Sequence, residues 1–200
     1  MVVIAGFVFL AYLMGSIPSA VLYGRIFHKM DVRDHGSGNA GATNSLRVLG
    51  KKAGLIVLIV DLLKGYLAIK IAHYFLGDDI SALIIIGFAA IIGHLLPIFS
   101  GFRGGKGIAT SFGVILALSP LGALVCLVVF MIVVYTTKYV SLASLLGSFS
   151  FIPFNFWNRP DNHFFHLMTI ALFLLLLFTH RQNVGRLINK VENKYPPKKL

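Results

Sequence analysis

The chain has 200 residues, of which 57% are apolar and 12% are charged, and its formal net charge is +11. A soluble domain carries roughly 25% charged residues, and a domain of this size has too small an interior to hide so much apolar surface from water. The composition therefore excludes an ordinary soluble domain and predicts an integral membrane protein.

Apolar segments follow one another along the sequence and predict an all-α fold with about seven transmembrane helices in a single membrane domain, residues 1–200. Their approximate ranges are 3–24, 53–76, 80–99, 107–118, 121–137, 140–157 and 164–179. A full crossing needs roughly 20 residues, so the fourth segment is short, and five crossings are the alternative. The first segment lacks a basic region and an obvious cleavage site, which favours a retained span over a signal peptide.

The charges between these segments predict the orientation of the chain. Basic residues fill every second connection and the tail, namely the stretch 25–52, the loop 100–106, Lys138 and the residues from Arg181 onward. The other connections hold few charges, among them Asp79 and Asp161. The positive-inside rule then places the N-terminus outside and the basic loops and C-terminus in the cytoplasm. Because this rule explains most of the positive charge, no nucleic-acid partner is expected.

The first candidate site segment is GSGNAGATNS at 36–45, in which every residue is small or polar. Small residues expose backbone N–H groups, and consecutive N–H groups can form an anion-binding nest. A flexible linker is the alternative, but the flanking basic residues favour a site. The hydroxyl of Ser37 and the guanidinium of Arg47 are candidates to bind a phosphate or a developing oxyanion. The further substrate-binding candidates are Gly36, Gly38, Asn39, Thr43 and Asn44.

The second segment runs from His94 to Gly107 and contains Gly104, Gly105 and Lys106. It is not a Walker A loop, because Ser100 stands where the first glycine is needed and Gly107 follows the lysine. What remains is a glycine-rich turn with a lysine before a helix, where the N-terminal dipole favours an anion. An interfacial turn with a snorkelling lysine explains the pattern equally well.

The third segment is HRQNVGRL at 180–187, directly after the last apolar segment. His180 and Asn183 lie three residues apart and share one face if the helix continues. A basic collar at a cytoplasmic helix end explains Arg181 and Arg186 but neither the histidine nor the asparagine.

Other polar residues have simpler interpretations. Asp61 and Lys64 lie three apart inside the second span, where charges usually pair and face other helices, so we interpret them as a structural ion pair. His73 and Asp78 have the spacing of an acyltransferase motif but fall on the outer side. His163 and His166 also fall outside and have no third ligand nearby, so no metal site is predicted.

Six stretches resemble the membrane glycerol-3-phosphate acyltransferase family that uses acyl phosphate, commonly called PlsY. They are GSIPSA at 15–20, HGSGNAGATNSLRVLGKKAG at 35–54, DLLKG at 61–65, GHLLPIFSGFRGGKG at 93–107, TKYVS at 137–141 and HRQNVGRL at 180–187 with Glu192 beyond. They are spread over the whole chain and follow one another in the same order as in the family. The resemblance implies a bacterial inner-membrane enzyme that transfers a fatty acyl group from acyl phosphate to the 1-hydroxyl of glycerol 3-phosphate, giving lysophosphatidic acid and phosphate.

The resemblance also implies roles for individual residues. The serine and arginine of the family's first motif match Ser37 and Arg47, and its Gly-Lys loop, assigned to glycerol 3-phosphate, matches residues 104–107. The histidine, asparagine and glutamate of the third motif match His180, Asn183 and Glu192, with Glu192 taken as structural. Ser141 in TKYVS is a further substrate-binding candidate. One difference is that Lys190 stands where a glycine is expected.

Acyl phosphate is a mixed anhydride with a good leaving group, so direct transfer within a ternary complex is expected, without an acylated enzyme or a cofactor. The expected partners are acyl phosphate, glycerol 3-phosphate and membrane lipid. Two alternatives are a transporter for an organic phosphate and a non-catalytic binder of lipid head groups. A transporter would need polar residues through the membrane, and apart from Asp61 and Lys64 the spans offer few.

Overall fold

A computed structural model describes residues 1–195 of the protein. Within this range every regular element is a helix, which confirms the all-α prediction. In chain order they are α1 Val2–Gly15, α2 Ser19–His28, η1 Val32–Asp34, α3 Ala42–Leu49, α4 Lys51–Leu76, α5 Ile80–Leu95, η2 Ile98–Ser100, α6 Ile108–Leu118, α7 Pro120–Thr137, α8 Val140–Asn158, α9 His163–Thr179 and α10 Arg181–Ile188. The helices fall into two compact units that divide between Leu118 and Ser119.

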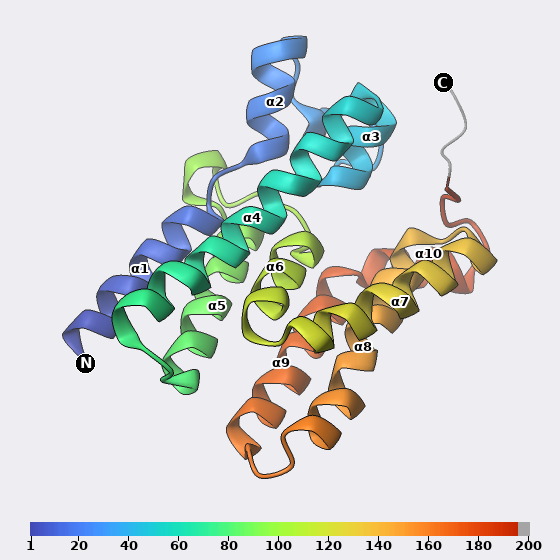
Figure 1. The fold of residues 1–200 in the computed structure, drawn as a ribbon. Coiled ribbons are helices and arrows are strands. Elements are labelled where there is room, and N and C mark those ends of the chain that lie inside the picture. Colours follow the sequence, from blue (N-terminus) through green and yellow to red (C-terminus); the bar gives the residue numbers. More distant parts are fainter. Residues whose placement is uncertain (196–200) are drawn as a thin grey trace. The chain divides into compact units, whose positions relative to one another are not determined.

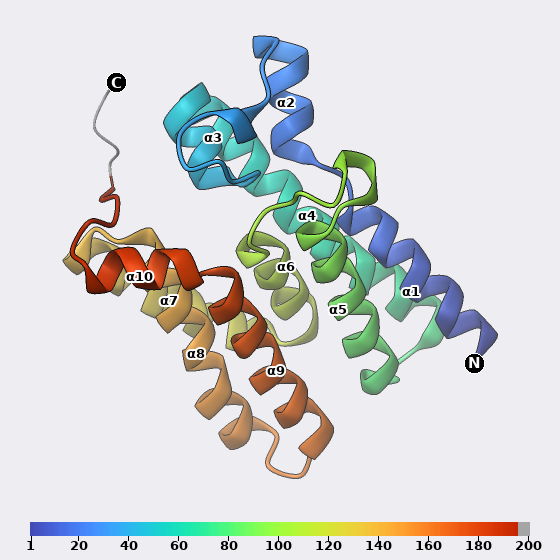
Figure 2. The same ribbon diagram turned by 180° about the vertical axis from the view of Figure 1, so that it is seen from behind.

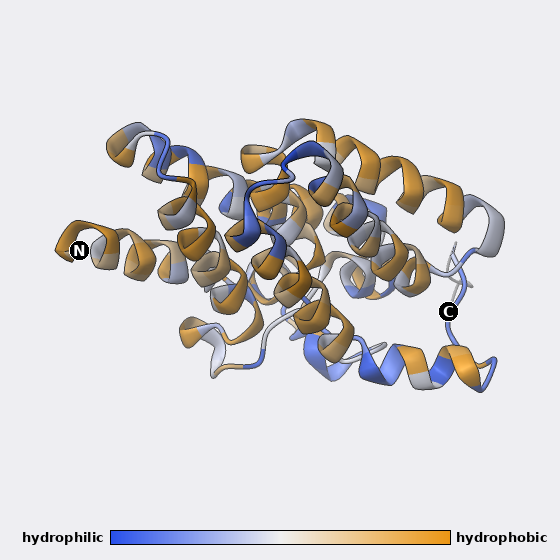
Figure 3. Cartoon of the chain, turned by 90° about the horizontal axis from the view of Figure 1, so that it is seen from below, coloured by the Kyte–Doolittle hydropathy of each residue, from blue (hydrophilic) through white to orange (hydrophobic). Residues whose placement is uncertain are grey.

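The described chain contains four stretches that are long and apolar enough to cross a membrane, or five if the bent pair α9 and α10 is one span. Helix α4 has 26 residues but carries Asp61 and Lys64 near its middle. Helix α6 has only 11 residues. Figure 3 shows hydrophobic residues over most of the long helices and hydrophilic residues mainly at helix ends and in connecting segments.

The first apolar segment does not form one continuous helix. Helix α1 ends at Gly15 and α2 begins at Ser19. Pro18 lacks a backbone N–H and disfavours the helical conformation at Ile17, so the ladder of hydrogen bonds is interrupted there. The ammonium group of Lys64 donates to the carbonyl of Ile17 at 3.1 Å. The side chain of another helix thus satisfies a carbonyl that the break exposes.

Helix α4 is the central element of the first unit, where it packs against α1, α2, α3, α5 and α6 (Figure 1). Small residues permit its closest approach to α6. A Cβ atom on Gly65 would overlap the carbonyl of Thr110, and one on Gly113 would overlap the carbonyl of Leu62. Close backbone approach at glycine is a common basis of helix packing in membranes.

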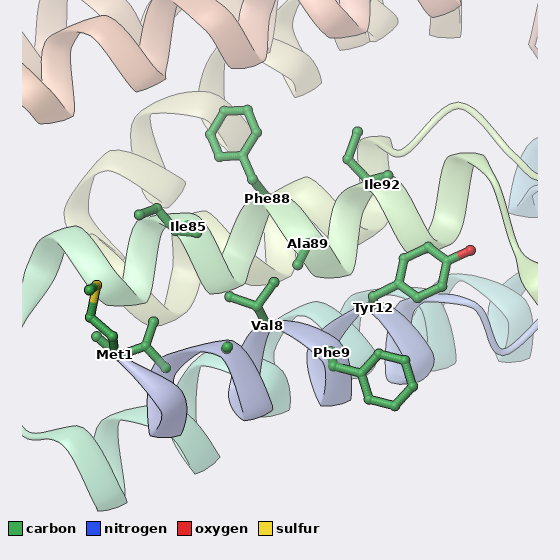
Figure 4. Close-up of a pocket in the computed structure, with 10 residues that line it drawn as sticks. Met1, Val8, Phe9, Tyr12, Ile85, Phe88, Ala89 and Ile92 are labelled. Carbon is green, nitrogen blue, oxygen red and sulfur yellow. The ribbon is translucent and has the colours of Figure 1, made fainter.

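An open apolar groove of about 870 Å³ lies along α1 and α5 in the first unit (Figure 4). Its lining includes Val8, Tyr12, Phe88, Ala89 and Ile92. The hydroxyl of Tyr12 donates to the carbonyl of Leu96 at 2.9 Å. The lining holds no charged side chain, which suits lipid chains and offers no chemistry for a polar substrate.

The second unit consists of α7, α8 and α9, packed in sequence, with α10 lying against α8 and α9 (Figure 2). Buried polar side chains join α8 to α9. The amide of Asn155 donates to the hydroxyl of Thr169 at 3.0 Å, and Thr169 donates to the carbonyl of Phe165 at 2.7 Å. Between α9 and α10 the chain bends by 64°.

Candidate active site

The polar segment 31–41 of the first unit is folded around the side chain of Asn44, which is buried in α3. Its Oδ1 accepts a hydrogen bond from the backbone N–H of Ser37 at 2.9 Å. Its Nδ2 lies within 2.9–3.1 Å of the carbonyl oxygens of Val32, His35 and Asn39. Asn44 therefore holds the segment together, and its amide is fully used for that purpose.

The segment 36–45 is only partly a loop, because its last four residues begin α3. Gly36 and Gly38 adopt φ values of 63° and 71°, which glycine reaches at little cost. The N–H of Ser37 is bound to Asn44, and the N–H of Gly38 donates to His35 at 3.1 Å. These two N–H groups are therefore engaged within the loop and are not available for the nest expected from the sequence.

The hydroxyl groups of Ser37 and Thr43 remain at the surface of this segment. Both residues are exposed, and within residues 1–195 neither hydroxyl makes a hydrogen bond to the protein. Both hydroxyl groups are therefore available to contact a ligand.

Arg33 joins the polar segment to the loop before α6. Its Nη1 donates to the carbonyl oxygens of Ser100 at 2.8 Å and Arg103 at 3.2 Å. Its Nε and Nη2 donate to the two carboxylate oxygens of Asp31 at 3.0 and 2.8 Å. From the sequence, Arg33 is only one of the basic residues in the stretch 25–52. The Asp-x-Arg spacing was the available signal, since such spacing suits a forked pair.

The hydrogen bond from the Arg33 side chain holds the pKa of Asp31 well below its ordinary value. A carboxyl group with a lowered pKa in the folded state stabilises the protein above its ordinary pKa, and this contribution is lost as the pH falls toward the lowered value. We expect Asp31→Asn to reduce the melting temperature clearly at pH 7 and by a smaller amount at pH 3, where part of the contribution is already lost. Thermal unfolding of both proteins in detergent measures this, and an equal reduction at the two pH values would contradict it.

Arg47 lies in the last turn of α3, which packs against α4. The residue is half-buried, and within residues 1–195 its guanidinium has no hydrogen bond or ion pair. A partly buried cation without a carboxylate partner is costly unless water or a ligand anion solvates it. Arg47 is thus available for an anion, as the sequence analysis expected.

The Gly-Lys loop, residues 101–107, lies against the end of α5. The N–H of Gly105 donates to the carbonyl of His94 at 3.2 Å, and a Cβ atom at Gly105 would also lie 3.1 Å from the carbonyl of Ala40. The loop therefore touches both α5 and the polar segment 31–41. Helix α6 begins at Ile108, so the expected position of half-buried Lys106 before a helix is confirmed.

A buried polar cluster lies behind this loop. The predicted ion pair is present, with Lys64 Nζ 2.9 Å from Asp61 Oδ1. The same carboxylate accepts from the hydroxyl of Ser19 at 2.6 Å, and the Nδ1 atom of His94 lies 3.5 Å away. All four residues are buried. The spacing of Asp61 and Lys64 predicts their pairing, but no local pattern predicts the approach of Ser19 and His94, which belong to other helices.

The pair His73 and Asp78 does not join this cluster. His73 and Asp78 are hydrogen-bonded at 2.8 Å in an exposed position at the end of α4. His73 is twelve residues beyond Asp61 on that helix, or about 18 Å along its axis. His166 contacts the carbonyl of Arg159 at 2.8 Å.

In the second unit, the carboxylate of Glu192 is bound by three side chains. Ser141 Oγ and Asn183 Nδ2 donate to Oε1 at 3.0 and 2.7 Å, and Arg186 Nε donates to Oε2 at 2.7 Å. Burial alone would raise the pKa of Glu192, but the hydrogen bonds from Arg186, Asn183 and Ser141 together lower it. Glu192 therefore ties α8 to α10, which agrees with the structural role that the resemblance implies.

His180 is the residue at which the chain bends between α9 and α10. Its Nδ1 atom lies 2.8 Å from the carbonyl of Leu176, which requires a proton on Nδ1. In a neutral ring, Nε2 is then the accepting nitrogen. The chain bends by 64° here, so α9 does not continue straight to Asn183, which lies in α10.

Lys190 adopts the backbone conformation that glycine would provide after α10. Its φ is 58°, its N–H donates to Leu187 at 3.1 Å, and the N–H of Val191 donates to Arg186 at 2.9 Å. These are the two hydrogen bonds of a Schellman motif, with Lys190 at the left-handed position.

Lys190→Gly is expected to raise the free energy of unfolding by about 1 kcal/mol, because the left-handed conformation disfavours residues with a Cβ. The melting temperature in detergent measures the effect. Asn189→Gly is the matched control, since Asn189 has a negative φ of −81°, and it should not stabilise the protein. Equal or lower stability of Lys190→Gly would contradict the expectation.

Known proteins similar to this chain match almost its whole length. A family model described as glycerol-3-phosphate acyltransferase matches residues 5–190. The glycerol-3-phosphate acyltransferase of Fusobacterium nucleatum subsp. nucleatum is 45% identical over 189 residues, which cover 94% of this chain and 96% of the relative. That of Listeria monocytogenes serotype 4a is 47% identical over 186 residues, covering 92% and 93%.

Two solved structures have the same fold. Both are crystal structures of PlsY, described as an integral membrane glycerol 3-phosphate acyltransferase. The glycerol 3-phosphate form has a TM-score of 0.90 and 39% identity and covers 96% of this chain and 95% of the other. The lysophosphatidic acid form has a TM-score of 0.88 and 37% identity, with coverage of 98% and 97%.

Proposed function

Since this chain belongs to the glycerol-3-phosphate acyltransferase family of integral membrane proteins, we propose that it transfers a fatty acyl group from acyl phosphate to the 1-hydroxyl of sn-glycerol 3-phosphate, giving lysophosphatidic acid and phosphate. The observation that carries the proposal is the half-buried, unpaired guanidinium of Arg47 in the same compact unit as the Gly-Lys loop. The hydroxyl groups of Ser37 and Thr43 supply neutral donors in that unit.

The reaction needs two phosphate groups close together, and their negative charges repel each other. Arg47 suits bidentate contact with one phosphate, whereas Lys106 offers a compact charge for the phosphate of glycerol 3-phosphate. Ser37 would donate a hydrogen bond to a phosphate or to the oxyanion that forms at the acyl carbon.

Acyl transfer is then direct, from the donor to glycerol 3-phosphate. The 1-hydroxyl oxygen of glycerol 3-phosphate bonds to the acyl carbon, and the bond from that carbon to the donor phosphate oxygen breaks. The hydroxyl proton passes to an oxygen of the donor phosphate, which leaves as inorganic phosphate. Because the leaving group is already activated, no nucleophilic side chain needs to be acylated. We assign His180 and Asn183 to the same reaction on the family resemblance, with Asn183 also holding Glu192.

The identity of the acyl donor is the part of the proposal that an assay tests most directly. We expect purified protein to release phosphate from acyl phosphate only when glycerol 3-phosphate is present, and to show little or no activity with acyl-coenzyme A. Initial rates should give intersecting lines, and labelled donor alone should leave the protein unlabelled. Activity confined to acyl-coenzyme A would refute the proposed donor. Parallel lines together with label trapped on Ser37 would refute direct transfer.

The same assay separates the alternatives. A transporter would move an organic phosphate across a sealed vesicle without changing it, and a binder of lipid head groups would show neither turnover nor transport. The buried polar side chains Asp61 and Lys64 are occupied by each other and by backbone and hydroxyl partners. Because both side chains are bound within the protein, they do not line a path for a transported solute, which favours an enzyme over a transporter.

We further propose seven crossings of a bacterial inner membrane, with the N-terminus outside and the Gly-Lys loop facing the cytoplasm. Because Cys126 is the only cysteine, labelling is done in a Cys126→Ala background. Cysteines at Asp79 and Asp161 should react from outside with an impermeant thiol reagent, because they lie in loops with few basic residues. Cysteines at Lys51 and Lys138 should react only after the membrane is opened. The reverse pattern would overturn the orientation.

A further inference from the structure

The side chain of His94 lies between the Gly-Lys loop and the buried ion pair, and the reaction scheme has not used it. It belongs to the last turn of α5 and is buried. One edge of its ring, at Nδ1, faces Asp61 at 3.5 Å. The other edge, at Nε2, faces Gly105 so closely that a Cβ atom there would overlap the ring. Its own carbonyl accepts the N–H of Gly105 at 3.2 Å.

The His94 ring, and not the backbone conformation, is what requires glycine at position 105. Gly105 is not among the glycines with positive φ, whereas Gly107 has a φ of 85°. Apart from the ring, the closest atom to a Cβ at position 105 is the carbonyl oxygen of Ala40 at 3.1 Å, a tight contact that requires a shift of only a few tenths of an ångström. Gly104 differs, because a Cβ there would overlap the backbone carbonyl of His94 itself and no side-chain change removes that atom.

We propose that His94 is a positioning residue, whose ring fills the space beside Gly105 and holds the loop so that Lys106 is fixed for its substrate. The Nδ1 edge of the ring lies beside Asp61. The Nε2 edge limits how closely Gly105 approaches α5. The geometry therefore links a buried ion pair of α4 to a lysine at the start of α6 through one side chain. The kinetic part of this inference rests on the proposed function, in which the loop binds glycerol 3-phosphate.

The expected kinetic result for His94→Ala is an increase of about tenfold in KM for glycerol 3-phosphate, with a smaller change in kcat. If His94 only filled space between helices, His94→Ala would lower stability without raising the KM for glycerol 3-phosphate selectively. His94→Gln should recover most of the affinity, because its amide reaches the position of Nε2. His94→Asn, whose amide reaches only the position of Nδ1, should recover little.

A double-mutant comparison gives the sharper test. Gly105→Ala should lower kcat/KM by about tenfold or more when His94 is present. In a His94→Ala protein the added methyl has room, so Gly105→Ala should cost little there. Gly104→Ala is the matched control, since its clash is with the backbone, and its cost should be the same with and without the ring. Equal costs of Gly105→Ala in both proteins would overturn the proposal.

A second readout is independent of the reaction. In the Cys126→Ala background, a cysteine at exposed Arg103 should react with a thiol reagent faster when His94 is alanine than when it is histidine or glutamine. This change together with the absence of any glycerol 3-phosphate turnover would refute the proposed function and leave the positioning role. An unchanged labelling rate together with an unchanged KM in folded His94→Ala protein would refute the positioning role alone.

Discussion

Arg47→Ala is expected to lower kcat/KM for acyl transfer by about 2–4 kcal/mol of transition-state stabilisation, roughly 30-fold to 1000-fold. The guanidinium is half-buried and has no protein partner in the described chain, so its removal should leave packing largely intact. What is lost is the cation that offsets the repulsion of two phosphates. Arg47→Lys should recover little, since an ammonium group cannot reproduce bidentate contact.

Lys106→Ala should lower kcat/KM by a similar amount, because it removes the cation proposed to bind the phosphate of glycerol 3-phosphate. Steady-state kinetics with both substrates varied measures the two variants. Lys52→Ala is the matched control, because Lys52 is an exposed basic residue at the start of α4 and should leave kcat/KM within about twofold. Near-normal kcat/KM in folded Lys106→Ala protein would remove Lys106 from the site.

The second large effect is on stability. Asp61→Ala should lower the free energy of unfolding by about 3–5 kcal/mol, because it leaves the ammonium group of Lys64 buried without its counter-charge. The carboxylate also accepts from Ser19 at 2.6 Å, and that hydroxyl would lose its partner. Equilibrium unfolding or the melting temperature in detergent measures the loss.

Replacing both charges should be milder than removing one. In Asp61→Leu/Lys64→Met no unpaired charge remains, although the carbonyl of Ile17 loses its donor. Asp34→Asn, at an exposed carboxylate, is the matched control and should change stability by less than about 0.5 kcal/mol. A double variant that is less stable than Asp61→Ala would mean that the two residues do not act as a pair.

The long helices could be predicted from the sequence because the apolar residues of each form one continuous stretch. All seven apolar segments are helical, and their observed ends fall within a few residues of the predicted ones, apart from the break at Pro18. The pairing of Asp61 with Lys64 was also predictable, since residues three apart on a helix are neighbours.

The contacts that organise the candidate site could not be predicted in this way, because they join residues far apart in the sequence. Arg33 reaches carbonyl groups 67 and 70 residues away. Asn44 can bind the surrounding loop only because α3 begins just before it. The small and polar residues of this segment did not indicate a helix start there. The bend at His180 was missed because nothing in the local sequence, such as a proline or glycine, marks it.

The shortness of α6 has a consequence for where the chemistry takes place. Its 11 residues rise about 16 Å, roughly half of a hydrocarbon core about 30 Å thick. If the helix ends at the outer face of the bilayer, as the proposed topology requires, Lys106 lies well below the cytoplasmic head groups. A small soluble phosphate would then have to reach into the membrane, where the bilayer is locally thinned, to meet its acyl donor.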